Sequence, residues 1–157
     1  MQEFSVEIAA SPLDCFTTIL DFESYPRWSS PIEHVVVIER DPHGIGRIVE
    51  FSIDVRFKSI RYVLSYTYRK PSELIWHSVD GDVESIEGVY TFEKLAGNRT
   101  LTTCRQAVSL GFWVPGPVRK LMERTALRQS VIEFKEEVER RQNLTKQKAK
   151  GKRQKST

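Results

Sequence analysis

The sequence is short of the residue types on which many catalytic and metal sites depend. Its 157 residues include two cysteines, Cys15 and Cys104, and three histidines, His34, His43 and His77. Two cysteines do not make a disulfide framework, so we expect both to be reduced thiols in a cytoplasmic protein. The histidines show no metal-ligand spacing, and neither a His-Glu-x-x-His nor a Gly-x-Ser-x-Gly motif occurs. The sequence therefore indicates no metal, no cofactor and no catalytic constellation.

Long apolar runs and a secretory signal are also missing. No stretch approaches the roughly 20 apolar residues that a membrane-spanning helix needs. The first residues, Met1-Gln2-Glu3-Phe4, lack the basic start and apolar core of a signal peptide. Hydrophobic residues make up 39% of the chain and aromatic residues 10%, which is ordinary for a globular protein. At this length we expect one cytoplasmic domain that buries about two thirds of its unfolded surface.

Acidic residues are absent from the end of the chain. Residues 140–157 hold eight of the 24 basic residues and none of the 21 acidic ones, so they carry +8 and the remaining 139 residues carry about −5. An acidic body argues against a basic nucleic-acid-binding domain. Because residues 142–157 contain one large apolar side chain and many like charges, we predict a basic disordered tail that follows a domain of residues 1–141.

This basic tail allows two interpretations. It either has no fixed partner or makes weak electrostatic contacts with an anionic membrane or with RNA. No aromatic residue lies among its charges, so base stacking is not indicated and we expect no specific nucleic-acid site.

What the sequence does contain is a long amphipathic segment near its end. Residues 118–141 hold neither proline nor glycine, and Pro117 suits a first helical turn because its missing N–H would find no partner there. An apolar stripe recurs at spacings of four, three and four residues, at Leu127, Val131, Phe134 and Val138. A second, mixed stripe lies beside it, at Val118, Met122, Thr125, Gln129 and Ile132. Such a helix has to lie on a large apolar surface.

The preceding residues predict a sheet that supplies this surface. Residues 4–9 alternate between apolar and polar side chains, and a helix then begins with Ser11 as its N-cap and Pro12 in its first turn. Residues 23–28 indicate a short second helical turn. Extended segments joined by tight turns follow at residues 35–40, 46–56, 60–69, 73–80, 86–95 and 99–110. Short strands in series indicate an antiparallel meander, and together with the helices an α+β fold.

Several segments resemble one protein family. They are Ala10-Ser11-Pro12-Leu13-Asp14-Cys15-Phe16, Asp21-Phe22-Glu23-Ser24-Tyr25-Pro26-Arg27-Trp28, Glu39-Arg40-Asp41, Tyr66-Thr67-Tyr68, Ile75-Trp76, Glu87-Gly88-Val89-Tyr90 and Val114-Pro115-Gly116-Pro117. Over about residues 3–140 the chain resembles the bacterial polyketide cyclase/dehydrase-like branch of the START/Bet v 1-like (SRPBCC) superfamily. That branch also contains proteins similar to the mitochondrial coenzyme Q-binding protein.

The resemblance implies a helix-grip fold. In this fold a curved antiparallel sheet of about seven strands wraps around a long C-terminal helix, and two short helices lie between the first two strands. It also implies an apolar cavity between sheet and helix that binds hydrophobic small molecules such as lipids, sterols, polyketides or isoprenoid quinones. A minority of members are cyclases or dehydratases, so family membership alone does not fix the chemistry.

Eight residues are candidate ligand contacts. Large aromatic rings with a polar tip suit an apolar ligand that carries a few oxygens. The rings on one face of neighbouring strands belong to Phe51, Tyr62, Tyr66, Trp76 and Tyr90. These rings either line a cavity or fill the core and leave no room. Trp28 either gates the cavity mouth or covers the sheet edge, and Met122 faces either the cavity or solvent. Gln106, if buried, needs polar partners and is a candidate contact for a ligand oxygen.

The leading hypothesis is binding, with transport or sequestration, of a hydrophobic small molecule such as a lipid, isoprenoid quinone or polyketide. The alternative is a polyketide cyclase/dehydratase-like enzyme that acts in the same cavity. It requires an enclosed acid or base with a perturbed pKa, and Asp80 is the one carboxylate that we would test. A third hypothesis is an interaction protein that acts through its tail.

Overall fold

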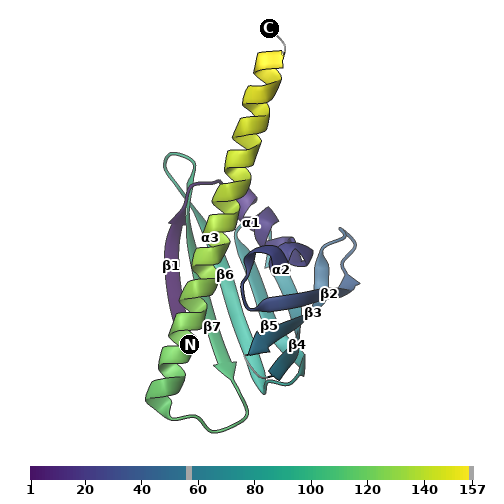
Figure 1. The fold of residues 1–157 in the computed structure, drawn as a ribbon, viewed down its shortest axis with the longest axis vertical. Helices are drawn as coiled ribbons and strands as arrows, with labels where there is room; N and C mark the ends of the chain where they lie inside the picture. The colour runs from purple at the N-terminus through teal and green to yellow at the C-terminus, as the bar shows by residue number, and fades with distance from the viewer. Residues whose placement is uncertain (56–57, 156–157) are drawn as a thin grey trace.

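The computed structural model, which describes residues 1–55 and 58–155, consists of one antiparallel sheet whose inner face is covered by helices (Figure 1). The strands are β1 (Gln2–Ile8), β2 (Ile32–Arg40), β3 (Gly46–Val55), β4 (Lys58–Arg69), β5 (Glu73–Gly81), β6 (Ser85–Leu95) and β7 (Arg99–Ser109). The helices are α1 (Pro12–Leu20), the 3-10 helix η1 (Phe22–Ser24), α2 (Tyr25–Trp28) and α3 (Gly116–Lys155).

The sheet order is β1-β7-β6-β5-β4-β3-β2, so consecutive strands from β2 to β7 pair as hairpins. The first and last strands also pair antiparallel, with Phe4 opposite Cys104. The prediction of an α+β helix-grip fold is confirmed, including the seven strands, the short helices between β1 and β2, and the long C-terminal helix.

Local sequence explains where the helices begin. At α1 the hydroxyl of Ser11 accepts a hydrogen bond from the backbone N–H of Asp14 at 3.1 Å, and Pro12 occupies the first turn, as predicted. At α3, Pro117 is the second helical residue. Both cysteines are buried and unpaired.

The apolar stripe of α3 forms the contact with the sheet. Leu127, Val131, Phe134 and Val138 are each at most 4% exposed, so the predicted buried stripe is confirmed. Figure 1 shows α3 crossing the sheet over β1 and β7, with α1 and α2 covering the part of the sheet on the other side of α3. Among the side chains that the structure describes, the last buried one is Val138.

Beyond the sheet α3 continues as a projecting helix (Figure 1). The sequence predicts a disordered tail from residue 142, whereas in the structure residues 142–155 extend α3 in one unbroken run. Since none of the described side chains in this extension is buried, tertiary packing does not hold it helical. The division into a domain of residues 1–141 and a separate tail stays a prediction.

Two glutamates of α3 bond to the connections around α1 and α2, and a third orients an arginine that does so. Glu139 accepts a hydrogen bond from the backbone N–H of Ala9 at 2.9 Å, and Glu133 accepts one from the N–H of Ser30 at 2.9 Å. Glu137 accepts hydrogen bonds from Arg140 and Arg141, each at 2.8 Å. These contacts hold α3 at a fixed place over the sheet.

Glu137 is the most enclosed of the three, with its side chain 4% exposed. Burial by itself would raise the pKa of this carboxyl, but the hydrogen bonds from Arg140 and Arg141 outweigh it, and the pKa lies below its ordinary value. Arg141 also donates to Asp21 and Ser24, at 3.0 and 3.1 Å, so Glu137 orients a side chain that joins α3 to η1.

We therefore predict that Glu137→Gln destabilises the protein. Losing the charge removes the carboxylate that Arg140 and Arg141 share and leaves Arg141 with Asp21 alone, which should lower the free energy of unfolding by about 1–2 kcal/mol at neutral pH. Urea denaturation followed by circular dichroism measures this difference. Because the folded pKa is depressed, the stabilisation is complete above the ordinary glutamate pKa of about 4.3 and is lost as the pH falls through the folded pKa, so the two proteins should converge in acid.

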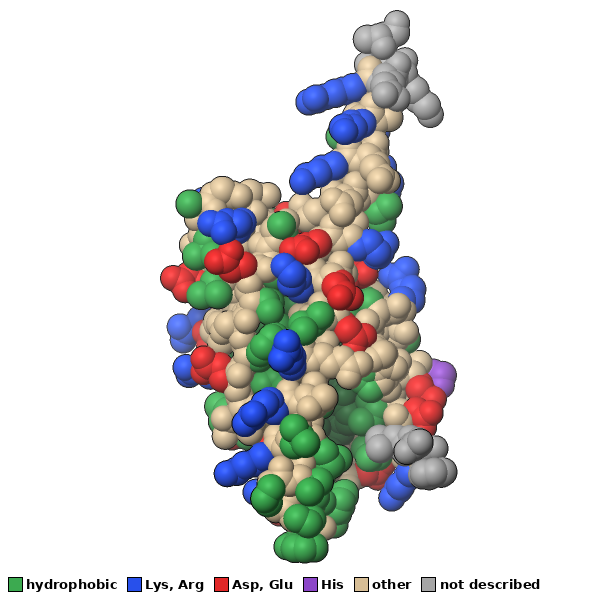
Figure 2. All heavy atoms as spheres, turned by 60° about the vertical axis from the view of Figure 1, so that its left-hand side comes forward, with side chains coloured by type: hydrophobic (Ala, Val, Ile, Leu, Met, Phe, Trp, Pro, Cys, Tyr) green, Lys and Arg blue, Asp and Glu red, His purple; other side chains and the backbone are tan. Residues whose placement is uncertain are grey.

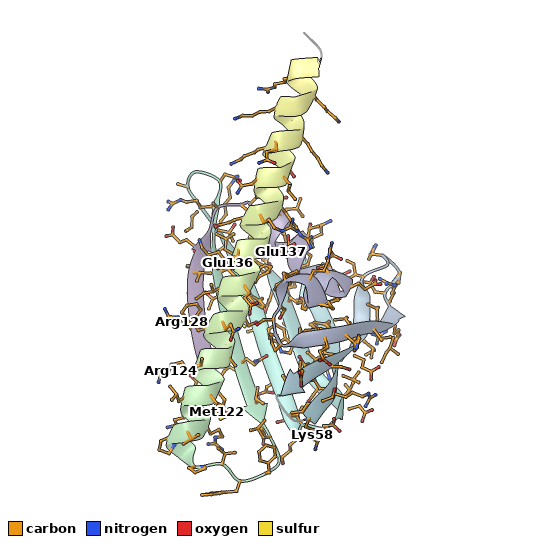
Figure 3. All side chains as sticks on the ribbon, viewed as in Figure 1. Lys58, Met122, Arg124, Arg128, Glu136 and Glu137 are labelled. Atoms are coloured by element: carbon orange, nitrogen blue, oxygen red, sulfur yellow. The ribbon has the colours of Figure 1, made fainter. Side chains whose placement is uncertain are left out.

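Glu136→Gln is the matched control for this prediction. Glu136 is exposed and makes no hydrogen bond or ion pair to any residue that the structure describes. Figure 3 labels both glutamates on the same stretch of α3. Its change should alter stability by at most about 0.5 kcal/mol. Equal effects of the two substitutions would contradict the role assigned to Glu137.

Candidate ligand-binding site

A cavity of about 350 Å³ lies between the sheet and the first turns of α3. In Figure 2 an apolar hollow is visible beside the helix, toward the end of the molecule where α3 begins. The sheet and its connections contribute Gln2, Ile53, Ile60, Tyr62, Val83, Ile86, Gln106, Val108, Leu110 and Phe112. The helix contributes Arg119, Met122, Glu123, Ala126 and Leu127. Most of this wall is aliphatic or aromatic, so it suits an apolar molecule.

The position of the cavity follows from the sizes of the side chains along α3. Toward the C-terminal part of the buried stripe, Phe134 contacts the rings of Trp28, Tyr90 and Phe92, with centroids 6.0, 5.4 and 6.2 Å away. Two turns earlier the helix presents Ala126, whose side chain is a single methyl group. The space that a ring fills at Phe134 therefore stays open near Ala126.

The structure separates the eight predicted contact residues into two groups. Tyr62, Gln106 and Met122 line the cavity. The other five belong to the hydrophobic core and do not line it, namely Trp28, Phe51, Tyr66, Trp76 and Tyr90. Their rings contact one another in a chain that runs from Tyr66 through Trp76 to Tyr90, with centroids 6.3 and 5.7 Å apart. A ligand contact for any of the eight stays a prediction.

Trp28 lies away from the cavity wall. Its indole N–H donates to Ser24 Oγ at 3.0 Å, and its ring packs on Tyr25 and Phe134 with centroids 4.7 and 6.0 Å apart. It therefore fills space between α2 and α3.

Gln106 is held at the wall by a row of residues that crosses three strands. Trp76 on β5 lies opposite Gly88 on β6, and Gly88 lies opposite Gln106 on β7. A Cβ atom at Gly88 would lie 2.4 Å from the Trp76 ring, so only glycine lets the indole cross this strand. The indole N–H then donates to Gln106 Oε1 at 3.3 Å. The side-chain NH2 of Gln106 makes no hydrogen bond to the residues that the structure describes, so this donor group is available to a ligand.

Tyr62 supplies a second polar group. Its ring stacks on Phe51, with centroids 5.3 Å apart and planes inclined by 21°. Within the described part of the chain its hydroxyl has no hydrogen-bond partner. Burial raises the pKa of Tyr62, so the phenol keeps its proton and acts as a hydrogen-bond donor.

Charged side chains stand on the helix side of the cavity. Arg119 and Glu123 face each other at 3.9 Å, and sequence reasoning did not select either of them. The signal that could have found them is helical spacing, since residues 119, 122, 123 and 126 share one face of α3. Two positions of the predicted mixed stripe lie elsewhere: Thr125 is exposed, and Gln129 donates to Ser30 Oγ at 2.8 Å.

Asp80, the carboxylate singled out for a catalytic test, lies outside the cavity. Its side chain is 66% exposed and pairs with Arg61 at 3.2 Å.

No group of three or more His, Cys, Asp or Glu side chains within the described ranges could hold a metal ion. No described helix combines the length and the apolar character that a membrane crossing requires.

Solved structures share this fold. A START superfamily protein from Mycobacterium smegmatis matches with a TM-score of 0.81 and 22% sequence identity, over 88% of this chain and 97% of that one. The Zhui aromatase/cyclase from Streptomyces sp. R1128 matches with a TM-score of 0.71 and 19% identity, over 89% and 93% of the two chains. A protein from Thermus thermophilus matches with a TM-score of 0.72 and 19% identity, over 87% and 94%. At these identities the likeness shows the fold alone.

Sequence comparison identifies the family. No curated protein matches the chain. The family model described as polyketide cyclase/dehydrase and lipid transport matches residues 8–135, which include every strand from β2 to β7 and most of the buried stripe of α3. The chain therefore belongs to the polyketide cyclase/dehydrase and lipid transport family, as the sequence resemblance predicted.

Proposed function

We propose that the protein binds a hydrophobic small molecule with at least one oxygen acceptor in the cavity between the sheet and the start of α3. The observation that supports this proposal is an apolar cavity of about 350 Å³ whose lining residues include two donor groups with no hydrogen-bond partner in the described part of the chain, the NH2 of Gln106 and the hydroxyl of Tyr62. Pockets for small ligands combine a mostly apolar wall with a few placed polar groups in this way.

The two donors limit the ligand class. A hydrocarbon in the cavity would leave both donors without a partner, which costs about 1–3 kcal/mol for each donor that loses water. A carbonyl or ether oxygen on an otherwise apolar molecule would satisfy them. Lipids, isoprenoid quinones and polyketides all have this combination, and the family description includes both polyketide chemistry and lipid transport. We propose transport or sequestration of such a molecule by a cytoplasmic protein.

Filling the cavity should prevent binding. Val108 lines it from β7, so Val108→Phe should place a ring in the space and weaken the binding of the neutral apolar dye Nile red at least about tenfold. Dye fluorescence under titration measures this. The control is the same exchange at Val79, which is 51% exposed and does not line the cavity. If Val79→Phe and Val108→Phe affect the affinity equally, the dye is not in this cavity.

The polar contact is tested by pairing a variant with two ligands. Tyr62→Phe should weaken the binding of a short-chain alkyl benzoquinone about five- to tenfold, because a hydrogen bond to its carbonyl is lost. The alkylbenzene with the same chain cannot make this bond, so its affinity should be unchanged or slightly higher. Calorimetric titration of both ligands measures the difference. Equal losses for both ligands would mean that Tyr62 acts through packing alone.

Catalysis in the same cavity is the alternative proposal. The fold likeness to an aromatase/cyclase and the presence of Tyr62 at the wall favour it. A raised pKa makes the phenol a weaker proton donor, however, which suits it to hold a carbonyl oxygen more than to transfer a proton in each turnover. Incubation with a linear poly-β-ketone, followed by mass spectrometry, separates the two proposals. A dehydrated product formed by the wild type but not by Tyr62→Phe would establish the enzyme.

A further inference from the structure

We infer that the end of the molecule where α3 begins docks on a phospholipid bilayer. This surface, which we call the apolar tip, consists of Phe112, Trp113, Val118, Leu121 and Met122. Trp113 is 85% exposed, Phe112 66% and Leu121 63%. Figure 2 shows apolar side chains gathered at this end of the molecule, below the hollow.

The apolar tip is built from the connection between β7 and α3 and the first turns of the helix. In those turns the buried stripe has not yet begun, since its first residue is Leu127. Trp113, Val118 and Leu121 are exposed and do not line the cavity, so neither the core nor the cavity gives a reason for them to be apolar. A cluster of exposed apolar residues of this kind marks an interaction surface.

Basic side chains lie beside the apolar tip on α3. Arg119, Lys120 and Arg124 are exposed on the first turns of α3, and residues 94–122 contain no acidic residue. Figure 3 shows Met122 and Arg124 on the same lower part of the helix. Of the carboxylates beside these turns, Glu123 lies 3.9 Å from Arg119, while Glu84 accepts a hydrogen bond from Ser109 and keeps its charge. Three basic groups against these two carboxylates leave a net positive charge beside the tip.

A bilayer surface matches this chemistry better than a protein partner does. Tryptophan sits favourably at the boundary between headgroups and acyl chains, and arginine and lysine beside it attract anionic phosphates. Residues 1–139 are acidic overall, so the group of basic side chains beside exposed apolar ones is a local exception to the charge of the domain. These features together favour insertion of Trp113 and Leu121 into the interfacial region.

The tip and the cavity share residues. Phe112 and Met122 belong to the apolar tip and also line the cavity. If the proposed function holds, a ligand can pass between the bilayer and the cavity without crossing water. Docking of the tip itself does not depend on that function.

Residues 142–155 of the basic tail form the opposite end of α3 (Figure 1). From Val118 to Lys155 a helix extends about 55 Å at 1.5 Å per residue. When the tip is inserted and α3 stands at a steep angle to the plane of the bilayer, the tail points away from the bilayer. Tail charge and tip apolarity therefore act independently, which makes them separable by substitution.

Flotation with vesicles tests the proposal. The full chain is mixed with vesicles of phosphatidylcholine, or of phosphatidylcholine with phosphatidylglycerol. We expect partition to both, stronger to the anionic vesicles. Replacing Trp113 and Leu121 together by serine should lower the partition coefficient at least about tenfold. The matched control replaces Val36 and Ile38, which are 53% and 54% exposed on β2, by serine and should leave partition unchanged.

Three further variants separate the possible causes of binding. Lys120→Glu with Arg124→Glu should abolish the preference for anionic vesicles, whereas Lys148→Glu with Lys150→Glu in the tail should not. Trp113→Phe should keep partition but lose most of the tryptophan quenching by brominated lipids, because Trp28 and Trp76 lie in or against the core. Circular dichroism shows whether each variant is folded, and Nile red binding without vesicles shows whether its cavity still binds a ligand. Loss of ligand binding in the cavity is thereby distinguished from loss of vesicle binding by the tip.

Several outcomes would overturn the proposal. Partition that depends only on the tail lysines would show electrostatic adsorption of the tail. Absence of partition by the folded wild type would exclude a bilayer. Concentration-dependent dimers that the tip serines abolish, without any vesicle binding, would assign the apolar tip to contact with a second copy of this chain.

Discussion

Burial of one stripe of α3 against the inner face of the sheet is the contact on which the rest of the structure depends. Leu127, Val131, Phe134 and Val138 are almost fully buried, and each such side chain stabilises the fold by about 1.5–3 kcal/mol. The stripe begins only at Leu127, although the helix begins at Gly116. Between Gly116 and Leu127 the helix therefore runs over the sheet without packing tightly against it, and the cavity lies between the two.

The cavity and the apolar tip have one physical origin. The early turns of α3 have no close packing partner in the sheet, so their side chains either border the open space, as Ala126 does, or face outward, as Leu121 does. The aromatic core behind the cavity fixes its polar groups. Phe51 stacks on Tyr62, and Trp76 passes over Gly88 to hold Gln106. Rigid support of this kind lets a few donors select a ligand without ordering costs at binding.

Periodicity predicted most of the fold but only part of the site. The stripe of α3, the alternation along the strands and the N-cap at Ser11 are local patterns, and the structure confirms them. The cavity wall is not local. Trp76 and Gln106 are both inward-facing, yet one fills the core and the other borders the cavity because of where α3 crosses the sheet. Sequence alone does not place that crossing, so Arg119 and Glu123 were missed.

Native mass spectrometry of the protein purified from its own host, followed by organic extraction of what it releases, tests whether the cavity holds a ligand. We expect one equivalent of a hydrophobic molecule that carries a carbonyl or ether oxygen, lost on denaturation and identified in the extract. An empty protein after gentle purification, which also fails to take up such a molecule when it is supplied, would contradict the claim that this cavity is a ligand site.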